Sequence, residues 1–248
     1  MKHLLKLEGM PSAAMEEILA STEVIKAKRG GGEAKPLDGQ TWAMIFTKSS
    51  TRTRVSFEVG IRELGGSVMF LNANDMQLGR GEPIKDTARV LGRMVHGAVI
   101  RTFAQADVEE FAEYSGIPTI NALTDDEHPC QILTDIFTFQ ERRGPIRGKV
   151  VTYVGDGGCN VPVSWVHAAA ALDFELRIAA PSEFQPSAET LAKAGGNISC
   201  TEDIRAAVKG ADMVYTDVWV SMGMEAEAEE RLAKLAGYQI NGGLMCLA

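Results

Sequence analysis

The stretch WAMIFTKSSTRTRVSFEVG, residues 42–60, joins a short apolar run to an amphipathic segment through a turn rich in hydroxyl and guanidinium groups. The run at 42–46 predicts a buried strand, and residues 53–64, followed by Gly65 and Gly66, predict a helix. A strand that leads directly into a helix is typical of parallel sheets. The stretch therefore predicts an α/β protein.

The same alternation of strands and helices continues on both sides of this stretch. Further strands are predicted at 68–71, 98–101, 118–121, 150–155, 175–180 and 211–217, and further helices at 12–28, 84–95, 108–114, 130–140, 163–172, 188–194 and 225–235. The charged segment ERRGPIRGK, 141–149, interrupts the pattern. We therefore expect two doubly wound parallel-sheet domains, residues 1–141 and 142–248.

The bulk composition narrows the class of protein. The 248 residues carry 25 Lys and Arg against 33 Asp and Glu, a net charge of -8, which argues against a general nucleic-acid or anionic-membrane binder. No apolar stretch reaches the ~20 residues of a membrane-spanning helix, and no signal-peptide pattern begins the chain, so we expect a cytoplasmic protein. Cys130, Cys159, Cys200 and Cys246 are scattered, which predicts reduced thiols.

The turn before the predicted helix at 53–64 favours a bound phosphate. The first turn of a helix has unpaired N–H groups and a partial positive charge. Ser50, Thr51 and Thr53 add hydroxyl donors, and Arg52 adds a planar fork of donors that matches phosphate oxygens. In an alternative interpretation, which this motif alone leaves open, Ser50 or Thr51 only caps the helix and the arginines point into water.

Two other strand ends carry groups that suit the same ligand. Arg101 ends a predicted strand, and His128 and Gln131, in HPCQ, follow another strand at the entrance to a helix. Open parallel sheets bind ligands at the carboxyl ends of their strands. We therefore expect these residues to share one edge of the sheet with Arg52, although a lone histidine such as His128 more often has a structural role.

These motifs together resemble the aspartate and ornithine carbamoyltransferase family. S-T-R-T-R followed by S-F-E, with a distant H-P-x-Q, is similar to its carbamoyl phosphate signature. GRGEPIKDTARVLGR (79–93), DDEHPCQIL (125–133) and YTDVWVSMG (215–223) resemble its ornithine branch. The resemblance runs from the first helix to the last residue. It implies transfer of the carbamoyl group of carbamoyl phosphate to the δ-amine of L-ornithine, giving L-citrulline and phosphate, as part of arginine metabolism.

The resemblance also implies which residues hold carbamoyl phosphate. The expected ligands are Ser50, Thr51, Arg52, Thr53, Gln77, Arg101, His128 and Gln131. Arg101, His128 and Thr53 are the implied catalytic residues, which polarise the carbamoyl carbonyl, while Gln131 binds the carbamoyl amino group. Gln77 corresponds to a residue that family members lend to a neighbouring subunit, which implies a homotrimer with sites at subunit interfaces. From sequence alone, Gln77 is an ordinary solvated loop residue.

For ornithine, the resemblance implies Asn160, Asp217, Ser221 and Met222. Asp217 suits the α-ammonium group, and Asn160 suits the α-carboxylate and amine. The alternatives are a helix cap for Asp217 and a core position for Met222. The run S-M-G favours the ornithine interpretation.

The implied chemistry needs no cofactor and no metal. The neutral δ-amine attacks the carbonyl carbon, phosphate leaves, and donors at Thr53, Arg101 and His128 stabilise the oxyanion that develops. Because an ammonium group is not a nucleophile, we expect the rate to rise with pH toward the pKa of the amine.

The sequence departs from the family pattern in two places. VGDGGCNVPVSW, 154–165, has an added glycine and Cys159 where the family has asparagine, so weaker binding of the ornithine carboxylate is expected. The same run lacks the G-x-G-x-x-G pattern of a dinucleotide site. The chain stops at YQINGGLMCLA, before the family's H-C-L-P loop. We therefore expect a second domain that is incomplete at its C-terminus, and either a longer gene product or a shortened form with impaired catalysis.

Two other functions compete with this interpretation. The first is carbamoyl transfer to another amine, such as aspartate or putrescine, against which the S-M-G run argues. The second is a truncated protein that binds carbamoyl phosphate or another subunit without turnover. Measurement of citrulline against carbamoylaspartate or carbamoylputrescine separates them.

Overall fold

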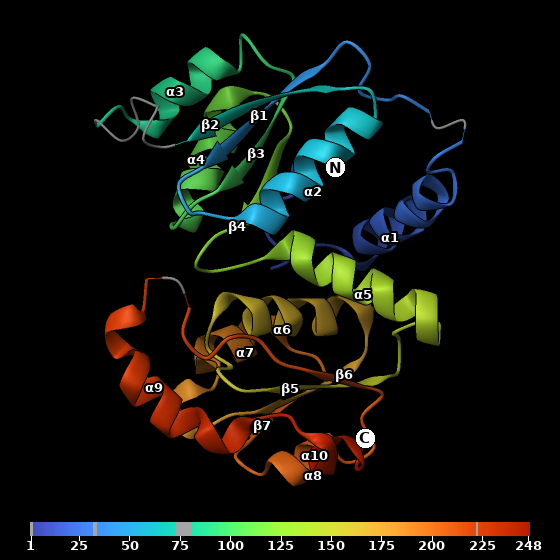
Figure 1. The fold of residues 1–248 in the computed structure, drawn as a ribbon, viewed down its shortest axis with the longest axis vertical. Coiled ribbons are helices and arrows are strands. Elements are labelled where there is room, and N and C mark those ends of the chain that lie inside the picture. Colours follow the sequence, from blue (N-terminus) through green and yellow to red (C-terminus); the bar gives the residue numbers. More distant parts are fainter. Residues whose placement is uncertain (1, 32–33, 73–80, 222) are drawn as a thin grey trace. The chain divides into compact units, whose positions relative to one another are not determined.

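The computed structural model describes residues 2–31, 34–72, 81–221 and 223–248. The chain divides into two compact units, one formed by Met1–Lys6 and Glu16–Cys130 (unit 1) and the other by Leu7–Met15 and Gln131–Ala248 (unit 2). Each unit has a four-stranded parallel sheet flanked by helices (Figure 1). The predicted α/β class with two doubly wound sheets is confirmed.

The sheet of unit 1 has the strand order β2-β1-β3-β4. Its strands are β1 (Thr41–Phe46), β2 (Ser67–Asn72), β3 (Gly97–Arg101) and β4 (Thr119–Leu123), and the helices along this part of the chain are α1 (Ser12–Ala27), α2 (Thr51–Glu63), α3 (Ile84–Leu91) and α4 (Gln105–Ser115). β1 pairs with β2 on one side and with β3 on the other. The strand order therefore reverses between β1 and β3, which is where open sheets bind ligands.

The side chains of β1 alternate between two hydrophobic cores, as the pleat of a strand requires. Trp42, Met44 and Phe46 pack on the face that α2 covers. Ala43 and Ile45 pack on the opposite face, which α3 and α4 cover (Figure 1). Burial of both faces explains why the strand is a continuous apolar run.

The sheet of unit 2 has the order β7-β6-β5-β8. Its strands are β5 (Val150–Val154), β6 (Glu175–Ala179), β7 (Ile198–Thr201) and β8 (Met213–Tyr215). The helices are α5 (Pro129–Arg143), α6 (Asn160–Leu172), α7 (Ala188–Ala194), α8 (Ile204–Val208), α9 (Ala228–Leu235) and α10 (Gly242–Met245), with single 3-10 turns at Ser182–Phe184, Glu225–Glu227 and Ala236–Tyr238. β5 pairs with β6 and β8, so the strand order reverses between β5 and β8.

Helices cover both faces of this second sheet (Figure 1). On the α6 side, the ring of Trp165 packs edge-on against Phe174 and Tyr215, at centroid distances of 5.9 and 5.3 Å. On the α8 side, Val154 and Val208 belong to a separate apolar cluster. In each unit, the point where the strand order reverses therefore lies between two packed layers of helices.

Three elements of unit 2 were absent from the sequence prediction: β7, α8 and α10. β7 has four residues, of which only Ile198 is strongly apolar, and α8 has five residues. Segments this short carry no readable periodicity. The predicted start of α2 was also two residues late, because Ser50 caps the helix and Thr51 begins it. No helix in the described ranges combines the length and apolar character needed to cross a bilayer.

Candidate functional site

The turn between β1 and α2 presents the first helical turn at the reversal point of the unit 1 sheet. Ser50 is the N-cap residue, and its Oγ accepts a hydrogen bond from the Thr53 backbone N–H at 3.2 Å. Ser50 therefore does cap the helix, as the alternative interpretation expects. The Ser50 hydroxyl hydrogen can still be donated, because this bond uses the oxygen only as an acceptor. Thr51 and Arg52 are exposed, and Thr53 is half-buried.

Arg101 lies beside this turn. It ends β3 and stands in register with Phe46, the last residue of β1. Its side chain is buried, and its Nε has no hydrogen-bond partner among the described residues. Burial, with the nearby positive charge of Arg52, lowers the pKa of Arg101. Two cations close together, one with a buried N–H that has no partner among the described residues, favour an anionic ligand.

His128 adds a neutral donor to this pair. It is half-buried and follows β4, the strand that pairs with β3. Burial, followed by the charge of Arg101, lowers the pKa of His128 to about 4. At neutral pH its imidazole is therefore uncharged and donates through only one ring nitrogen. Arg52, Arg101 and His128 thus come together, as expected from the three adjacent strand ends.

Lys48 is a buried cation at this site that the sequence analysis did not single out. It pairs with Asp125, and its Nζ lies 4.4 Å from the centroid of the Phe103 ring. The pair connects the β1–α2 turn to the loop between β4 and α5, which carries His128. In the sequence, Lys48 is marked only by its position two residues before Ser50. Without the fold, such a lysine is expected to be a solvated surface charge.

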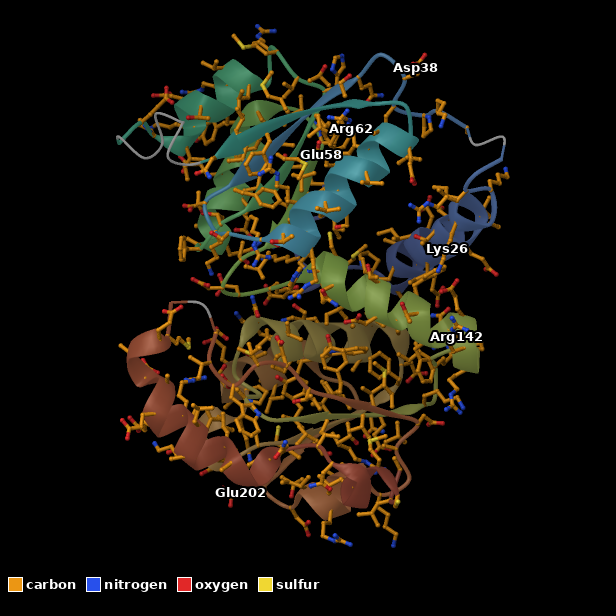
Figure 2. The ribbon with its side chains drawn as sticks, viewed as in Figure 1. Lys26, Asp38, Glu58, Arg62, Arg142 and Glu202 are labelled. Carbon is orange, nitrogen blue, oxygen red and sulfur yellow. The ribbon has the colours of Figure 1, made fainter. Side chains whose placement is uncertain are left out.

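The other arginines of α2 are engaged away from Arg101. Arg54 stacks on the Phe70 ring, with its guanidinium carbon 3.6 Å from the centroid. Arg62 pairs with Glu58 one turn earlier, at 3.1 Å (Figure 2). Arg52 is therefore the arginine of this helix whose charge acts on Arg101.

The second reversal point, in unit 2, is formed by the segments that follow β5 and β8. Gly155, just after β5, has φ of 130°, a conformation that favours glycine. Asn160 begins α6 and is half-buried. After β8, the Thr216 hydroxyl donates to the Val154 carbonyl at 2.8 Å, which holds the two segments side by side.

Asp217 gives this second point a negative charge. It is half-buried, and its Oδ1 accepts a hydrogen bond from the Val218 N–H at 2.8 Å. Burial, with a further contribution from the charge of Asp217, raises the pKa of Asp156. The same two effects help to raise the pKa of the Cys159 thiol to about 12. Cys159 is therefore a neutral thiol at physiological pH. Ser221 follows on the same segment and is half-buried.

A buried arginine holds this second point in place. Arg231, on α9, pairs with Asp156 and donates through Nε to the Trp219 carbonyl at 2.9 Å. Its guanidinium also lies 4.9 Å from the centroid of the Phe184 ring. Arg231 and Asp156 are both buried. The arginine thus links the segment after β5 to the segment after β8, a role that no spacing in the sequence indicated.

Gln131, expected among the ligands of carbamoyl phosphate, lies in the part of α5 that belongs to unit 2. Its Nε2 is 3.0 Å from both carboxylate oxygens of Asp135, and Tyr215 donates its hydroxyl to Asp135 at 2.7 Å. The Gln-Asp spacing of four residues was a usable signal that the sequence analysis passed over.

Two expected ligands, Gln77 and Met222, lie outside the described residues. In the ranges that are described, no cluster of three or more His, Cys, Asp or Glu side chains is arranged to hold a metal ion.

Comparison with known proteins places both halves of the chain in one family. Residues 2–141 match the carbamoyl-P binding domain of aspartate/ornithine carbamoyltransferase, and residues 147–248 match its Asp/Orn binding domain. The chain is 54% identical over 248 residues to ornithine carbamoyltransferase from Akkermansia muciniphila, with 99% of this chain and 81% of the relative aligned. It is 46% identical over 245 residues to the anabolic ornithine carbamoyltransferase of Pseudomonas aeruginosa, with 98% of this chain and 80% of the relative aligned.

A solved structure agrees with these sequence matches. Ornithine carbamoyltransferase from Pyrococcus furiosus superposes with a TM-score of 0.93 at 43% identity. The superposition covers 100% of this chain and 81% of that chain. The chain therefore spans about four-fifths of the length of these relatives.

Proposed function

The chain belongs to the aspartate/ornithine carbamoyltransferase family, and we propose from that premise how its residues transfer a carbamoyl group from carbamoyl phosphate to the δ-amine of L-ornithine. The products are L-citrulline and phosphate. The single observation that carries the assignment of residues is the contrast in charge between the two reversal points. Unit 1 has two neighbouring arginines, one of them buried with an N–H that no described residue accepts, and unit 2 has a half-buried aspartate.

Carbamoyl phosphate is proposed to bind through its phosphate at the start of α2. The backbone N–H groups of the first turn, the hydroxyls of Ser50, Thr51 and Thr53, and the Arg52 guanidinium supply donors for the phosphate oxygens. Arg101 Nε, which is buried and has no partner in the described part of the chain, suits an oxygen of carbamoyl phosphate. Gln77 and Gln131 complete the proposed set.

The carbonyl oxygen of carbamoyl phosphate gains negative charge during the reaction, and it is proposed to bind among three hydrogen-bond donors. Arg101, neutral His128 and the Thr53 hydroxyl are the proposed donors to this oxygen. Because the imidazole of His128 is already uncharged at neutral pH, it serves as a fixed hydrogen-bond donor and not as a general acid. As the amine nitrogen bonds to the carbonyl carbon, the carbonyl oxygen becomes an oxyanion. Its collapse restores the C=O double bond and breaks the bond between the carbon and the phosphate oxygen, and the departing phosphate takes up the proton that the nitrogen loses.

L-Ornithine is proposed to bind at the reversal point of unit 2. Asp217 pairs with the α-ammonium group, and Asn160, Ser221 and Met222 complete the proposed contacts. Cys159, where family members have asparagine, is a neutral thiol and a weak hydrogen-bonding group. We expect it to bind the α-carboxylate more weakly than an amide.

Further properties are proposed from the family resemblance. We propose domain limits of 1–141 and 142–248, a homotrimer with sites at subunit interfaces, and a cytoplasmic enzyme of arginine biosynthesis. The name of the Pseudomonas relative, anabolic ornithine carbamoyltransferase, supports the biosynthetic direction.

The test of this proposal is product analysis with purified protein. Incubation with carbamoyl phosphate and L-ornithine should yield citrulline and phosphate in equal amounts, at a rate that rises with pH toward the pKa of the amine. Aspartate or putrescine in place of ornithine should give no carbamoylated product. Carbamoylaspartate or carbamoylputrescine formed without citrulline would refute the choice of acceptor. Binding of carbamoyl phosphate without any product would support a protein that only binds it.

A further inference from the structure

The side chain of Gln131 is held in one orientation by its neighbours. Its Nε2 lies 3.0 Å from both Oδ1 and Oδ2 of Asp135, one helical turn later in α5. Tyr215, the last residue of β8, donates its hydroxyl to Asp135 Oδ2 at 2.7 Å. The carboxylate therefore receives donors from a helix and from a strand end, all within unit 2.

The chemistry of the three groups fixes which end of the Gln131 amide faces Asp135. An ionised carboxylate accepts hydrogen bonds and cannot donate, so the NH₂ end of the amide must face it. The reversed amide would set two acceptors against each other. The network thus determines an orientation that atom positions alone leave ambiguous. Among the described residues, nothing donates to the amide oxygen Oε1.

Tyr215 keeps the network in this state. Burial, together with the adjacent Asp135 carboxylate, raises the pKa of Tyr215 well above its ordinary value, so the hydroxyl keeps its proton. Burial raises the pKa of Asp135, while the hydrogen bonds from Gln131 and Tyr215 oppose that rise. Removal of either donor therefore raises the pKa of Asp135 and disfavours the ionised carboxylate, on which the orientation of the Gln131 amide depends.

We propose that Asp135 and Tyr215 are positioning residues that present the Gln131 amide oxygen to the NH₂ group of the carbamoyl donor, and so select carbamoyl phosphate over acyl phosphates that lack this group. The inference rests on the proposed function, which makes Gln131 the ligand of the carbamoyl amino group. A carbamoyl NH₂ donates to the oxygen, whereas the methyl group of acetyl phosphate leaves the oxygen unpaired. A site built to hydrogen-bond an N–H discriminates in this way.

Binding of two donors separates this role from a merely structural one. Affinities for carbamoyl phosphate and acetyl phosphate are measured by calorimetry with the wild type and with Asp135→Asn, Gln131→Leu and the double variant. An asparagine at 135 offers either an acceptor or a donor to Gln131, which allows the glutamine amide to flip. We expect Asp135→Asn to lose about tenfold in affinity for carbamoyl phosphate and to retain its affinity for acetyl phosphate.

Two further arms make the result specific. In the Gln131→Leu background, Asp135→Asn should have almost no additional effect, because there is no amide left to orient. Tyr215→Phe should lower the preference for carbamoyl phosphate by a smaller factor, about threefold, because Gln131 still faces the carboxylate. This second variant also tests the proposal if Asp135→Asn does not fold, as judged by circular dichroism.

An equal loss of affinity for both donors, or an unchanged preference in Asp135→Asn and Tyr215→Phe, would overturn the proposal. A wild type that forms citrulline while these variants keep its preference would refute the positioning role and leave the proposed function intact. A wild type that forms no citrulline and binds both donors equally would refute both.

Discussion

The two sheets place their candidate sites at the same topological position but give them opposite charge. In unit 1 the order β2-β1-β3-β4 reverses between β1 and β3, beside Arg52 and Arg101. In unit 2 the order β7-β6-β5-β8 reverses between β5 and β8, beside Asp156 and Asp217. Topology thus determines where a ligand binds, while the charges on the strand ends determine which ligand it is.

The charges also differ in how far each unit compensates them. In unit 1 the pKa of Arg101 is lowered by burial and by Arg52, so both cations are stabilised when an anion binds. In unit 2, Arg231 compensates Asp156, and Gln131 and Tyr215 donate to Asp135, whereas among the described residues no cation pairs with Asp217. The charges of unit 1 thus suit a phosphate, and those of unit 2 suit an ammonium group.

Removal of the buried cation of unit 1 should have the largest effect. Arg101→Leu is expected to lower kcat/KM for carbamoyl phosphate by about 10³-fold, because a donor to the developing oxyanion and a charge are lost together. Arg54→Leu is the matched control, since Arg54 stacks on Phe70 instead of acting on Arg101. Similar losses in both variants would mean that net charge, not position, explains the effect.

The next largest effect should follow when the buried ion pair of unit 2 is broken. Arg231→Leu leaves Asp156 buried without its cation and should lower the free energy of unfolding in urea by about 4 kcal/mol. Asp156→Asn combined with Arg231→Leu should recover part of this loss, because no uncompensated charge remains. If the single variant unfolds like the wild type, Arg231 does not hold the segments after β5 and β8 together.

A pH dependence should come from unit 1 and from His128. Its pKa is lowered from 6.5 to about 4 in the folded state, so the unfolded chain binds more protons between these values. Stability should therefore be complete above pH 6.5 and fall by about 2 to 3 kcal/mol as the pH drops toward 4. His128→Gln, which cannot titrate, should show a flatter curve in urea denaturation at several pH values. Parallel curves would contradict the lowered pKa.

Neutralisation of the acceptor site should have a smaller effect. Asp217→Asn is expected to raise KM for L-ornithine about 20-fold through loss of a charge-assisted bond to the α-ammonium group, with little change in KM for carbamoyl phosphate. Asp38→Asn removes the same charge from an exposed position (Figure 2) and should behave like the wild type. A larger change for carbamoyl phosphate than for ornithine would reverse the assignment of the two sites.

The sequence predicted the strand ends of unit 1 well because β1 is buried on both faces and its apolar run leads directly into a capped helix. Arg101 could be placed because it ends a short apolar strand. Lys48, Arg231 and Asp156 could not be singled out, because the contacts that bury them join residues 75 or more positions apart. β7 was missed because four residues at a sheet edge show no pattern. Local periodicity thus predicts elements, whereas long-range ion pairs need the fold.

Crystals of the protein with carbamoyl phosphate and L-norvaline, which is ornithine without its δ-amine, test the contrast between the two sites most directly. We expect phosphate oxygens on the first turn of α2 and on Arg52, the carbonyl oxygen beside Arg101, and the α-ammonium group on Asp217. Carbamoyl phosphate bound at the β5/β8 end, or norvaline bound at the β1/β3 end with Asp217 in solvent, would contradict it.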